Sequence, residues 1–184
     1  RPTEDESAGK RRYERLGRGA RRETGAAQCR PLSLKLVFTC TGSEANDLAY
    51  RLAEYYTGGE GFIITENAYH GGTKVIAELS PSLGAMVMRN KNVRVIPAPD
   101  AYRAKGADVG SEFAQHVKAA IEDMQKNGVK PAALIVDTIF ASDGVFVDPP
   151  GILTKAVESV RSAGGLFIAD EVQAGFGKKK KKMW

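Results

Sequence analysis

The stretch LFIADEVQAGFG at residues 166–177 is the part of this sequence that indicates the fold most directly. Its first residues, 166–169, form an apolar run that is typical of a buried strand. That run ends abruptly in Asp170, Glu171 and Gln173. A carboxylate at the end of a buried strand needs a partner, because an unpaired anion is costly to remove from water. In open α/β sheets, ligands bind at the carboxyl ends of the strands, so Asp170 lies where a ligand is expected. Capping of the next turn, or pairing with a basic side chain, is also compatible with this motif alone.

Further apolar runs rich in Val, Ile and Phe indicate more strands, at residues 34–39, 61–65, 93–97 and 132–139. Helices are predicted between the strands, over about 44–57, 71–80, 111–127 and 151–163. Three of these helices are followed by stop signals, at Gly58, Gly128 and Gly164. Because strands and helices alternate, the sequence predicts an α/β fold with a mostly parallel sheet and helices on both faces.

Composition excludes some classes of protein. The chain has 184 residues and is 42% hydrophobic, which is enough for a sizeable core. No apolar run approaches the roughly 18 residues of a membrane span, and no signal peptide is evident, so we expect a soluble, cytoplasmic protein without membrane contacts. Cys29 and Cys40 are too few for a disulfide framework or a metal site, and Cys40 is expected to be a small buried packing residue.

The net charge of +5 is unevenly distributed along the chain. Residues 1–30 hold nine Arg and Lys against five Asp and Glu, and residues 178–182 are all Lys. We therefore expect a basic, disordered tail at 1–33, a folded domain at 34–177, and a polylysine tail at 178–184. The domain itself is acidic, which argues against specific nucleic-acid binding. The lysine run is compatible with a solvated tail or with a polyanion-binding element.

The loop after the first predicted strand has two possible roles. Thr41 and Glu44 have the spacing of a capping box, which would begin a helix. Gly42 and Ser43 at a helix N-terminus could also present backbone N–H groups and a hydroxyl to a phosphate.

The loops after the next strands carry further candidate residues. Tyr69 and His70 precede two glycines, so the aromatic ring could stack on a planar ligand that the backbone approaches closely. The alternative is that Tyr69 is a half-buried core aromatic and His70 is a turn residue. Asp137 lies within an apolar run and needs a hydrogen-bond partner or a place at the strand end, whereas Asp143 with Gly144 is a turn signal.

Four of these segments together resemble a known family. TGSEAND (41–47), AYHGG (68–72), IVDTIFASDG (135–144) and FIADEVQAGFG (167–177) are similar, in order and spacing, to the class III aminotransferases. These are fold-type-I pyridoxal-phosphate enzymes, so the resemblance implies that the chain forms part of their large domain and that its cofactor is pyridoxal 5′-phosphate. The Asp137–Thr138 pair places it nearer the alanine–glyoxylate transaminases and amino-alcohol phosphate lyases.

The resemblance also implies roles for single residues. Gly42 and Ser43 match the residues that hold the cofactor phosphate, and Tyr69 matches the aromatic that stacks on the ring. Asp170 matches the catalytic aspartate that keeps the ring nitrogen protonated, and Gln173 matches a side chain near the phenolic oxygen. The cofactor-binding residues implied in this way are Gly42, Ser43, Tyr69, His70, Asp137, Asp170 and Gln173.

The implied reaction transfers an amino group from a small-molecule amino donor to an oxo acid or aldehyde, in an enzyme that is a homodimer when complete. The family's Schiff-base lysine lies beyond the segment that resembles this chain, and residues 178–182 do not match it, so we expect the chain to be inactive alone. A phospho-lyase of an amino-alcohol phosphate and a non-catalytic binding or dimerising fragment are the alternatives.

Overall fold

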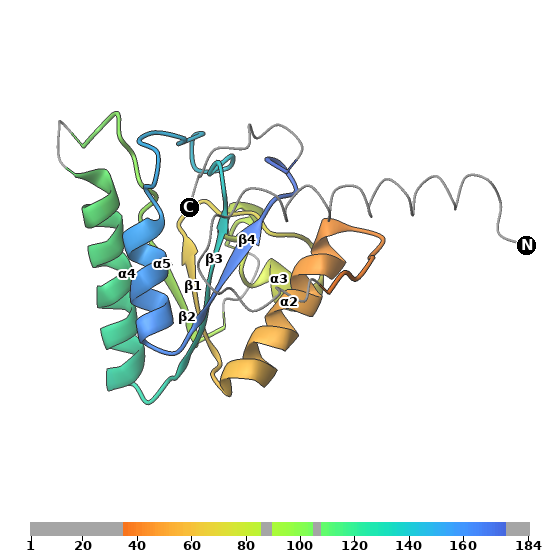
Figure 1. Cartoon of the computed structure of the whole chain (residues 1–184). Coiled ribbons are helices and arrows are strands. Elements are labelled where there is room, and N and C mark those ends of the chain that lie inside the picture. Colours follow the sequence, from red (N-terminus) through yellow and green to blue (C-terminus); the bar gives the residue numbers. More distant parts are fainter. Residues whose placement is uncertain (1–34, 86–89, 105–107, 176–184) are drawn as a thin grey trace, which may run out of the picture. The chain divides into compact units, whose positions relative to one another are not determined.

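A computed structural model describes residues 35–85, 90–104 and 108–175 (Figure 1). The chain divides into two units, Arg1–Val37 and Phe38–Trp184, and the fold described here is that of the second. Its elements, in chain order, are α2 (Gly42–Thr57), β1 (Gly61–Thr65), α3 (Lys74–Ala77), the 3-10 turn η1 (Pro81–Leu83), β2 (Val93–Ile96), α4 (Val109–Lys126), β3 (Pro131–Asp137), α5 (Thr154–Ser162) and β4 (Leu166–Asp170). Among the described residues, no helix is both long and apolar enough to cross a membrane.

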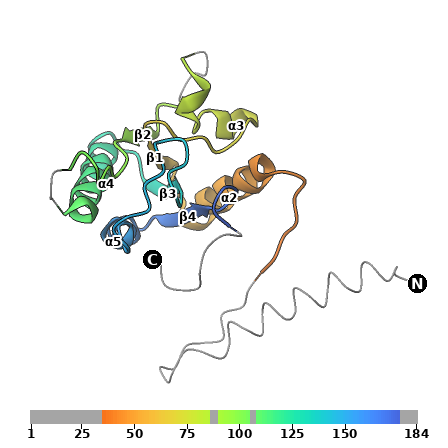
Figure 2. The ribbon, with the colours of Figure 1, turned by 90° about the horizontal axis from the view of Figure 1, so that it is seen from above.

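The described strands form one parallel sheet in the order β2-β1-β3-β4. Viewed from above, α4 and α5 cover one face of this sheet, and α2 and α3 lie on the other (Figure 2). The predicted α/β fold, with a parallel sheet and helices on both faces, is therefore confirmed. All strands run the same way, so their carboxyl ends share one edge, where Asp137 of β3 is the register partner of Asp170 of β4.

Alternating strand residues supply two separate cores. Ile63 and Leu134 belong to the core under α4 and α5, whereas Phe62 and Ile135 belong to the core under α2 and α3. Both faces are buried, which explains why these strands read as continuous apolar runs rather than as alternating patterns. On the α2 side, the ring of Tyr50 stacks on Phe62 with ring centres 4.1 Å apart.

The helix boundaries follow local signals in the sequence. The Thr41 side chain accepts the N–H of Glu44 and begins α2, as the capping-box spacing predicts. Gly58 ends α2 with a φ of 62°, and Gly128 and Gly164 also adopt positive φ after α4 and α5. These three stop signals are confirmed, because the left-handed conformation that ends such helices is easiest for glycine.

Two predicted elements differ in the structure. The strand predicted at 34–39 is wrong for its described residues, 35–39, which belong to no strand pairing of the described chain. An apolar segment becomes a strand only where a neighbour bonds its backbone. The helix predicted at 71–80 is shortened to α3, since Gly71 has a non-helical φ of 136° and Pro81 disfavours helical geometry at the preceding residue. Cys40 is exposed, so its predicted burial is also wrong.

Candidate active site

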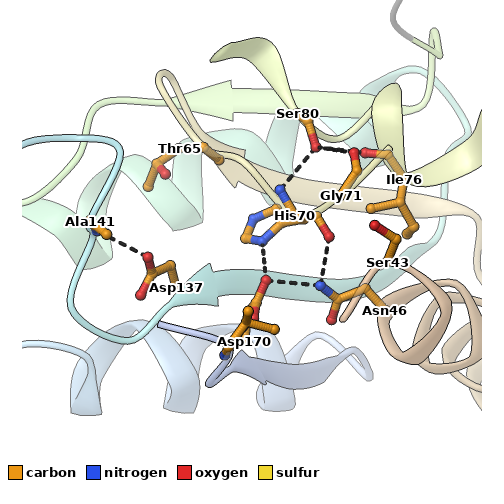
Figure 3. A network of polar contacts seen from close by, with 12 residues as sticks. Ser43, Asn46, Thr65, His70, Gly71, Ile76, Ser80, Asp137, Ala141 and Asp170 are labelled. Carbon is orange, nitrogen blue, oxygen red and sulfur yellow. Dashed lines mark hydrogen bonds and ion pairs between the residues drawn. The ribbon is translucent and has the colours of Figure 1, made fainter. Parts of the chain in front are cut away.

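Four of the predicted site residues lie near one another at the carboxyl edge of the sheet: Ser43, His70, Asp137 and Asp170 (Figure 3). They come from the N-terminus of α2, from the segment between β1 and α3, and from the ends of β3 and β4. Although far apart in sequence, these segments are joined by hydrogen bonds between side chains. The convergence expected from the sequence is therefore present in the structure.

Asp170 is the centre of this network. It ends β4 and is only 6% exposed. Its Oδ2 accepts hydrogen bonds from His70 Nδ1 at 2.9 Å and from Asn46 Nδ2 at 2.8 Å, while Oδ1 accepts the N–H of Val172 at 3.1 Å. The carboxylate therefore has three donors, and of its roughly four lone-pair sites one remains for a further donor.

These contacts decide the charge of Asp170. Burial by itself raises the pKa of this carboxyl, but the hydrogen bonds from His70, the Val172 N–H and Asn46 outweigh burial and hold the pKa below its usual value. Asp170 is thus ionised at neutral pH. Because an ionised carboxylate only accepts hydrogen bonds, Nδ1 of His70 must carry the proton that lies between the two side chains.

His70 is fixed along its whole length. Its side chain is fully buried, its N–H donates to Ser80 Oγ at 2.9 Å, and its carbonyl accepts Asn46 Nδ2 at 2.8 Å. Ser80 is itself buried within hydrogen-bond distance of the carbonyls of Ile76 and Gly71. Nε2 of His70 is buried without a hydrogen-bond partner among the described residues. The histidine is therefore a core residue, and Asp170 is the polar partner of its side chain within the described part of the chain.

The N-terminus of α2 lies against the glycines that follow His70. Ser43 Oγ accepts the N–H of Gly72 at 3.0 Å. A Cβ on Gly71 would lie 2.8 Å from Ser43 Cα, so only glycine allows this approach. The N–H groups of Gly42 and Ser43, in the first turn of α2, make no hydrogen bond to another described residue. Within the described part of the chain, this corner therefore presents two unpaired amides and a hydroxyl.

The remaining predicted residues occupy different positions. Tyr69 is 46% exposed, beside His70. Asp137 lies next to Asp170, but its two oxygens accept the N–H groups of Ile139 and Ala141 in its own loop, both at 3.0 Å. Gln173 is exposed in the turn after β4. Their roles toward a cofactor stay predictions.

Glu171 differs from Asp170 as the alternation of strand side chains predicts. Its Oε1 accepts the Thr138 hydroxyl at 2.7 Å, whereas Asp170 accepts from His70 and Asn46. Asp170 and Glu171, although adjacent in the sequence, therefore have different hydrogen-bond partners.

Sequence reasoning missed several residues of the network, and Asn46 is the most informative. It lies on the buried face of α2 with Tyr50, Ala53 and Thr57, so a polar side chain stands in a helical stripe of core positions. A buried amide needs partners, and that signal could have identified Asn46 before the structure. Ser80 gave no such signal, because its partners are the backbone groups of His70, Gly71 and Ile76, and a backbone partner leaves no mark in the sequence.

Comparison with known proteins gives the family. The family model described as aminotransferase class-III matches residues 15–182. The alanine–glyoxylate aminotransferase 2-like protein of Drosophila melanogaster is 36% identical over 164 residues, which cover 84% of this chain and 33% of that protein. Ethanolamine-phosphate phospho-lyase homolog 1 of Caenorhabditis elegans is 35% identical over 165 residues, covering 81% of this chain and 35% of that protein.

Solved structures agree with the sequence relatives. A phospholyase from Arthrobacter in complex with phosphoethanolamine superposes with a TM-score of 0.73 at 34% identity, covering 82% of this chain and 36% of that one. The chain spans about a third of the length of these relatives. Class III aminotransferases are pyridoxal-phosphate enzymes, so the predicted cofactor class and the predicted resemblance are both confirmed. This chain belongs to the class III aminotransferase family.

Proposed function

We propose that the site around Asp170 holds pyridoxal 5′-phosphate and serves the transfer of an amino group from a small-molecule amino donor to an oxo acid or aldehyde. The observation that carries this proposal is the ionised, buried carboxylate of Asp170 at the carboxyl edge of the sheet, with the N-terminus of α2 beside it. A homodimeric assembly of the complete enzyme is part of the same proposal.

The donor set around Asp170 fits a pyridine ring that is protonated on nitrogen. The carboxylate has a lone-pair site left after its three hydrogen bonds, and its partners, His70 and Asn46, hold it ionised. A protonated ring nitrogen would offer both a hydrogen bond and the cationic partner that a buried anion requires. Asp170 would therefore hold the proton on that nitrogen at neutral pH.

The N-terminus of α2 fits the cofactor phosphate. The N–H groups of Gly42 and Ser43, which have no partner among the described residues, and the positive end of a 16-residue helix favour an anion. The Ser43 hydroxyl accepts a bond from Gly72, which leaves its own proton for a phosphate oxygen. Asn46, one turn further along, ties this helix end to Asp170, so the ring and phosphate contacts would be set by one rigid element.

Tyr69 and Gln173 complete the proposed set. The Tyr69 ring is about half exposed at this edge, so it is available to stack on a flat ligand. Gln173 would reach the ring from the turn after β4. When bound, pyridoxal phosphate supplies an electron sink for the electron pair left at the substrate carbon, and ring protonation strengthens that sink. The contribution of Asp170 is to maintain that protonation.

Elimination of phosphate from an amino-alcohol phosphate is the second candidate reaction. The phospholyase from Arthrobacter, bound to phosphoethanolamine, matches at 34% identity with a TM-score of 0.73. A transaminase with L-alanine matches at 25% identity with a TM-score of 0.64. The same cofactor site would serve both reactions, so substrates distinguish them.

Cofactor binding is tested best with pyridoxamine 5′-phosphate, which lacks the aldehyde that would react with lysine side chains, of which the chain has five in succession at residues 178–182. Calorimetric titration of the full chain should show one site. Asp170→Asn and Ser43→Ala should each weaken binding by about tenfold or more, which corresponds to one lost charge-assisted contact. Ser142→Ala, an exposed substitution in a neighbouring loop, should stay within about twofold. Equal affinity in all four proteins would refute the proposed site.

Turnover is tested separately. Because residues 178–182 are not expected to serve as the family's Schiff-base lysine, we expect this polypeptide to show no transfer from alanine to glyoxylate and no phosphate release from phosphoethanolamine above the rate with free pyridoxal phosphate. Turnover that Asp170→Asn abolishes would contradict the expected inactivity, and the substrate consumed would then identify the reaction.

A further inference from the structure

Asp143 joins two loops at the carboxyl edge of the sheet. Its Oδ2 accepts the Thr65 hydroxyl at 2.6 Å, and its Oδ1 accepts the N–H of Asn67 at 2.9 Å. Thr65 ends β1 and is 1% exposed, whereas Asp143 lies 78 positions later, in the segment between β3 and α5. The carboxylate therefore connects the end of one strand to the loop that follows another.

The segment that carries Asp143 is itself firmly held. Asp137 accepts two N–H groups of this segment, and the Phe140 carbonyl accepts those of Asp143, Gly144 and Val145 at 3.0–3.1 Å. The Phe140 side chain is 1% exposed and packs edge-on against Phe113 of α4, with ring centres 5.9 Å apart. Asp143 therefore lies in a loop that internal hydrogen bonds and the buried Phe140 side chain hold in place.

The segment that Asp143 holds leads directly to the proposed cofactor contacts. Asn67 is bonded to Asp143, and three residues later His70 is bonded to Ser80, Asn46 and Asp170. Between these anchors, the Ala68 N–H bonds the Thr65 carbonyl. The Ala68 carbonyl also accepts the N–H of Ser82 at 3.2 Å and its hydroxyl at 3.0 Å. The segment 67–70 is therefore fixed at both ends. Tyr69 is partly exposed, so its position depends on these neighbouring anchors rather than on packing of its own ring in the core.

We propose that Asp143 is a positioning residue: by holding Thr65 and Asn67 it sets the segment that presents Tyr69 to the cofactor and carries His70, the partner of Asp170. This inference rests on the proposed function for its consequence, although the contacts of Asp143 stand without it. Burial raises the pKa of Asp143, and the hydrogen bonds from Thr65 and Asn67 oppose that effect, so the tether also stabilises its ionised form.

The two donors differ in what they require of residue 143. The N–H of Asn67 can only donate, whereas the Thr65 hydroxyl can donate or accept. An Asn at 143 can therefore keep both contacts, with its carbonyl oxygen accepting from Asn67 and its amide donating to Thr65. Asp143→Asn should preserve the tether, and Asp143→Ala should remove it. Thr65→Val keeps the shape of the buried side chain and removes one contact.

Hydrogen exchange of the full chain measures the tether without any cofactor. Amides of Ala68 and His70 are the reporters, because they are hydrogen-bonded to groups other than Asp143. Their exchange should rise by about tenfold or more in Asp143→Ala, rise less in Thr65→Val, and stay near wild type in Asp143→Asn and in the exposed control Ser142→Ala. The amide of Val117, which is fully buried in α4, should exchange at its wild-type rate in all of these variants.

Some results would overturn the inference. Unchanged exchange at Ala68 and His70 in Asp143→Ala would show that the segment does not depend on the tether. A rise of the same size at Val117 would show a general loss of stability instead of local positioning. If Asp143→Ala does not fold, Thr65→Val and Asp143→Asn decide the question, since a positioning role predicts a local rise in the first and none in the second.

Binding of pyridoxamine 5′-phosphate adds the functional readout. Asp143→Ala should bind it about tenfold more weakly than wild type, and Asp143→Asn should restore most of the affinity. Wild-type affinity in Asp143→Ala would contradict the positioning role. If the wild-type chain itself binds no cofactor analogue, the proposed function fails, while the exchange measurement still judges the tether.

Discussion

Replacing Asn46 by alanine tests the network that holds Asp170. The Asn46 amide donates two hydrogen bonds of 2.8 Å, one to the carbonyl of His70 and one to Oδ2 of Asp170. Asn46 is 6% exposed, so water cannot readily replace the amide. Asn46→Ala therefore leaves a buried carbonyl and a buried carboxylate each with one donor fewer.

The expected loss of stability follows from the two contacts. A hydrogen bond to a charged group contributes about 1.5–3 kcal/mol, and one between neutral groups about 0.5–1.5 kcal/mol. The better helix propensity of alanine returns up to about 0.7 kcal/mol in α2. The free energy of unfolding should therefore fall by about 1.5–4 kcal/mol, which is a large part of the roughly 5–15 kcal/mol typical of a folded domain.

Urea unfolding of wild type, Asn46→Ala and the matched control Arg51→Ala measures the effect. Arg51 lies in the same helix, and its exposed ion pair with Asp47 contributes less than about 1 kcal/mol. A double-mutant cycle with Asp170→Asn should show a coupling of at least about 0.5 kcal/mol. The reasoning is refuted if Asn46→Ala unfolds at the same urea concentration as Arg51→Ala, or if the cycle shows no coupling.

Three further results are expected. Gly71→Ala should destabilise the chain by about 1–3 kcal/mol, because Gly71 has a φ of 136° and lies against Ser43. Gly72→Ala should change the stability little, because a Cβ there meets open space. Equal urea midpoints for the two variants would contradict this. The pKa of Asp170 is lowered on folding, so its ionisation stabilises the folded chain above about pH 4. The difference in unfolding free energy between wild type and Asp170→Asn, measured by urea titration, should therefore shrink as the pH falls below about 4. A difference that grows on acidification would contradict this. Any binding to nucleic acid should weaken steeply with salt in a fluorescence titration, since the basic residues concentrate near the chain ends, and sequence-selective binding at high salt would disprove this.

Local sequence signals predicted most of the fold. The strands β1 and β3 are apolar at nearly every position because both faces of the sheet are covered, and Gly58 ends α2 because it can adopt positive φ. The strand expected at 34–39 failed for the described residues 35–39 because pairing, which composition does not encode, decides whether an apolar segment becomes a strand.

The site was predicted less completely than the fold. Asp170 stood out because a carboxylate ends an apolar run, but its partners His70 and Asn46 lie 100 and 124 positions away. Asp143 read as a turn residue, and its bond to Thr65 spans 78 positions. Contacts of this kind depend on strand order and loop geometry, so the sequence indicated Asp170 and His70 but not the contact between them, and it did not indicate Asn46.

The ionisation of the cofactor's ring nitrogen tests the central claim most directly. Pyridoxamine 5′-phosphate, isotope-labelled at that nitrogen and bound to the full chain, reports its protonation by NMR across a pH titration. We predict that the pKa of the ring nitrogen is higher when bound to the wild-type chain than free in solution, and that Asp170→Asn removes the increase. A bound ring nitrogen that titrates as it does in free solution, or one whose pKa is equally raised in Asp170→Asn, would contradict the assignment of Asp170 as its partner.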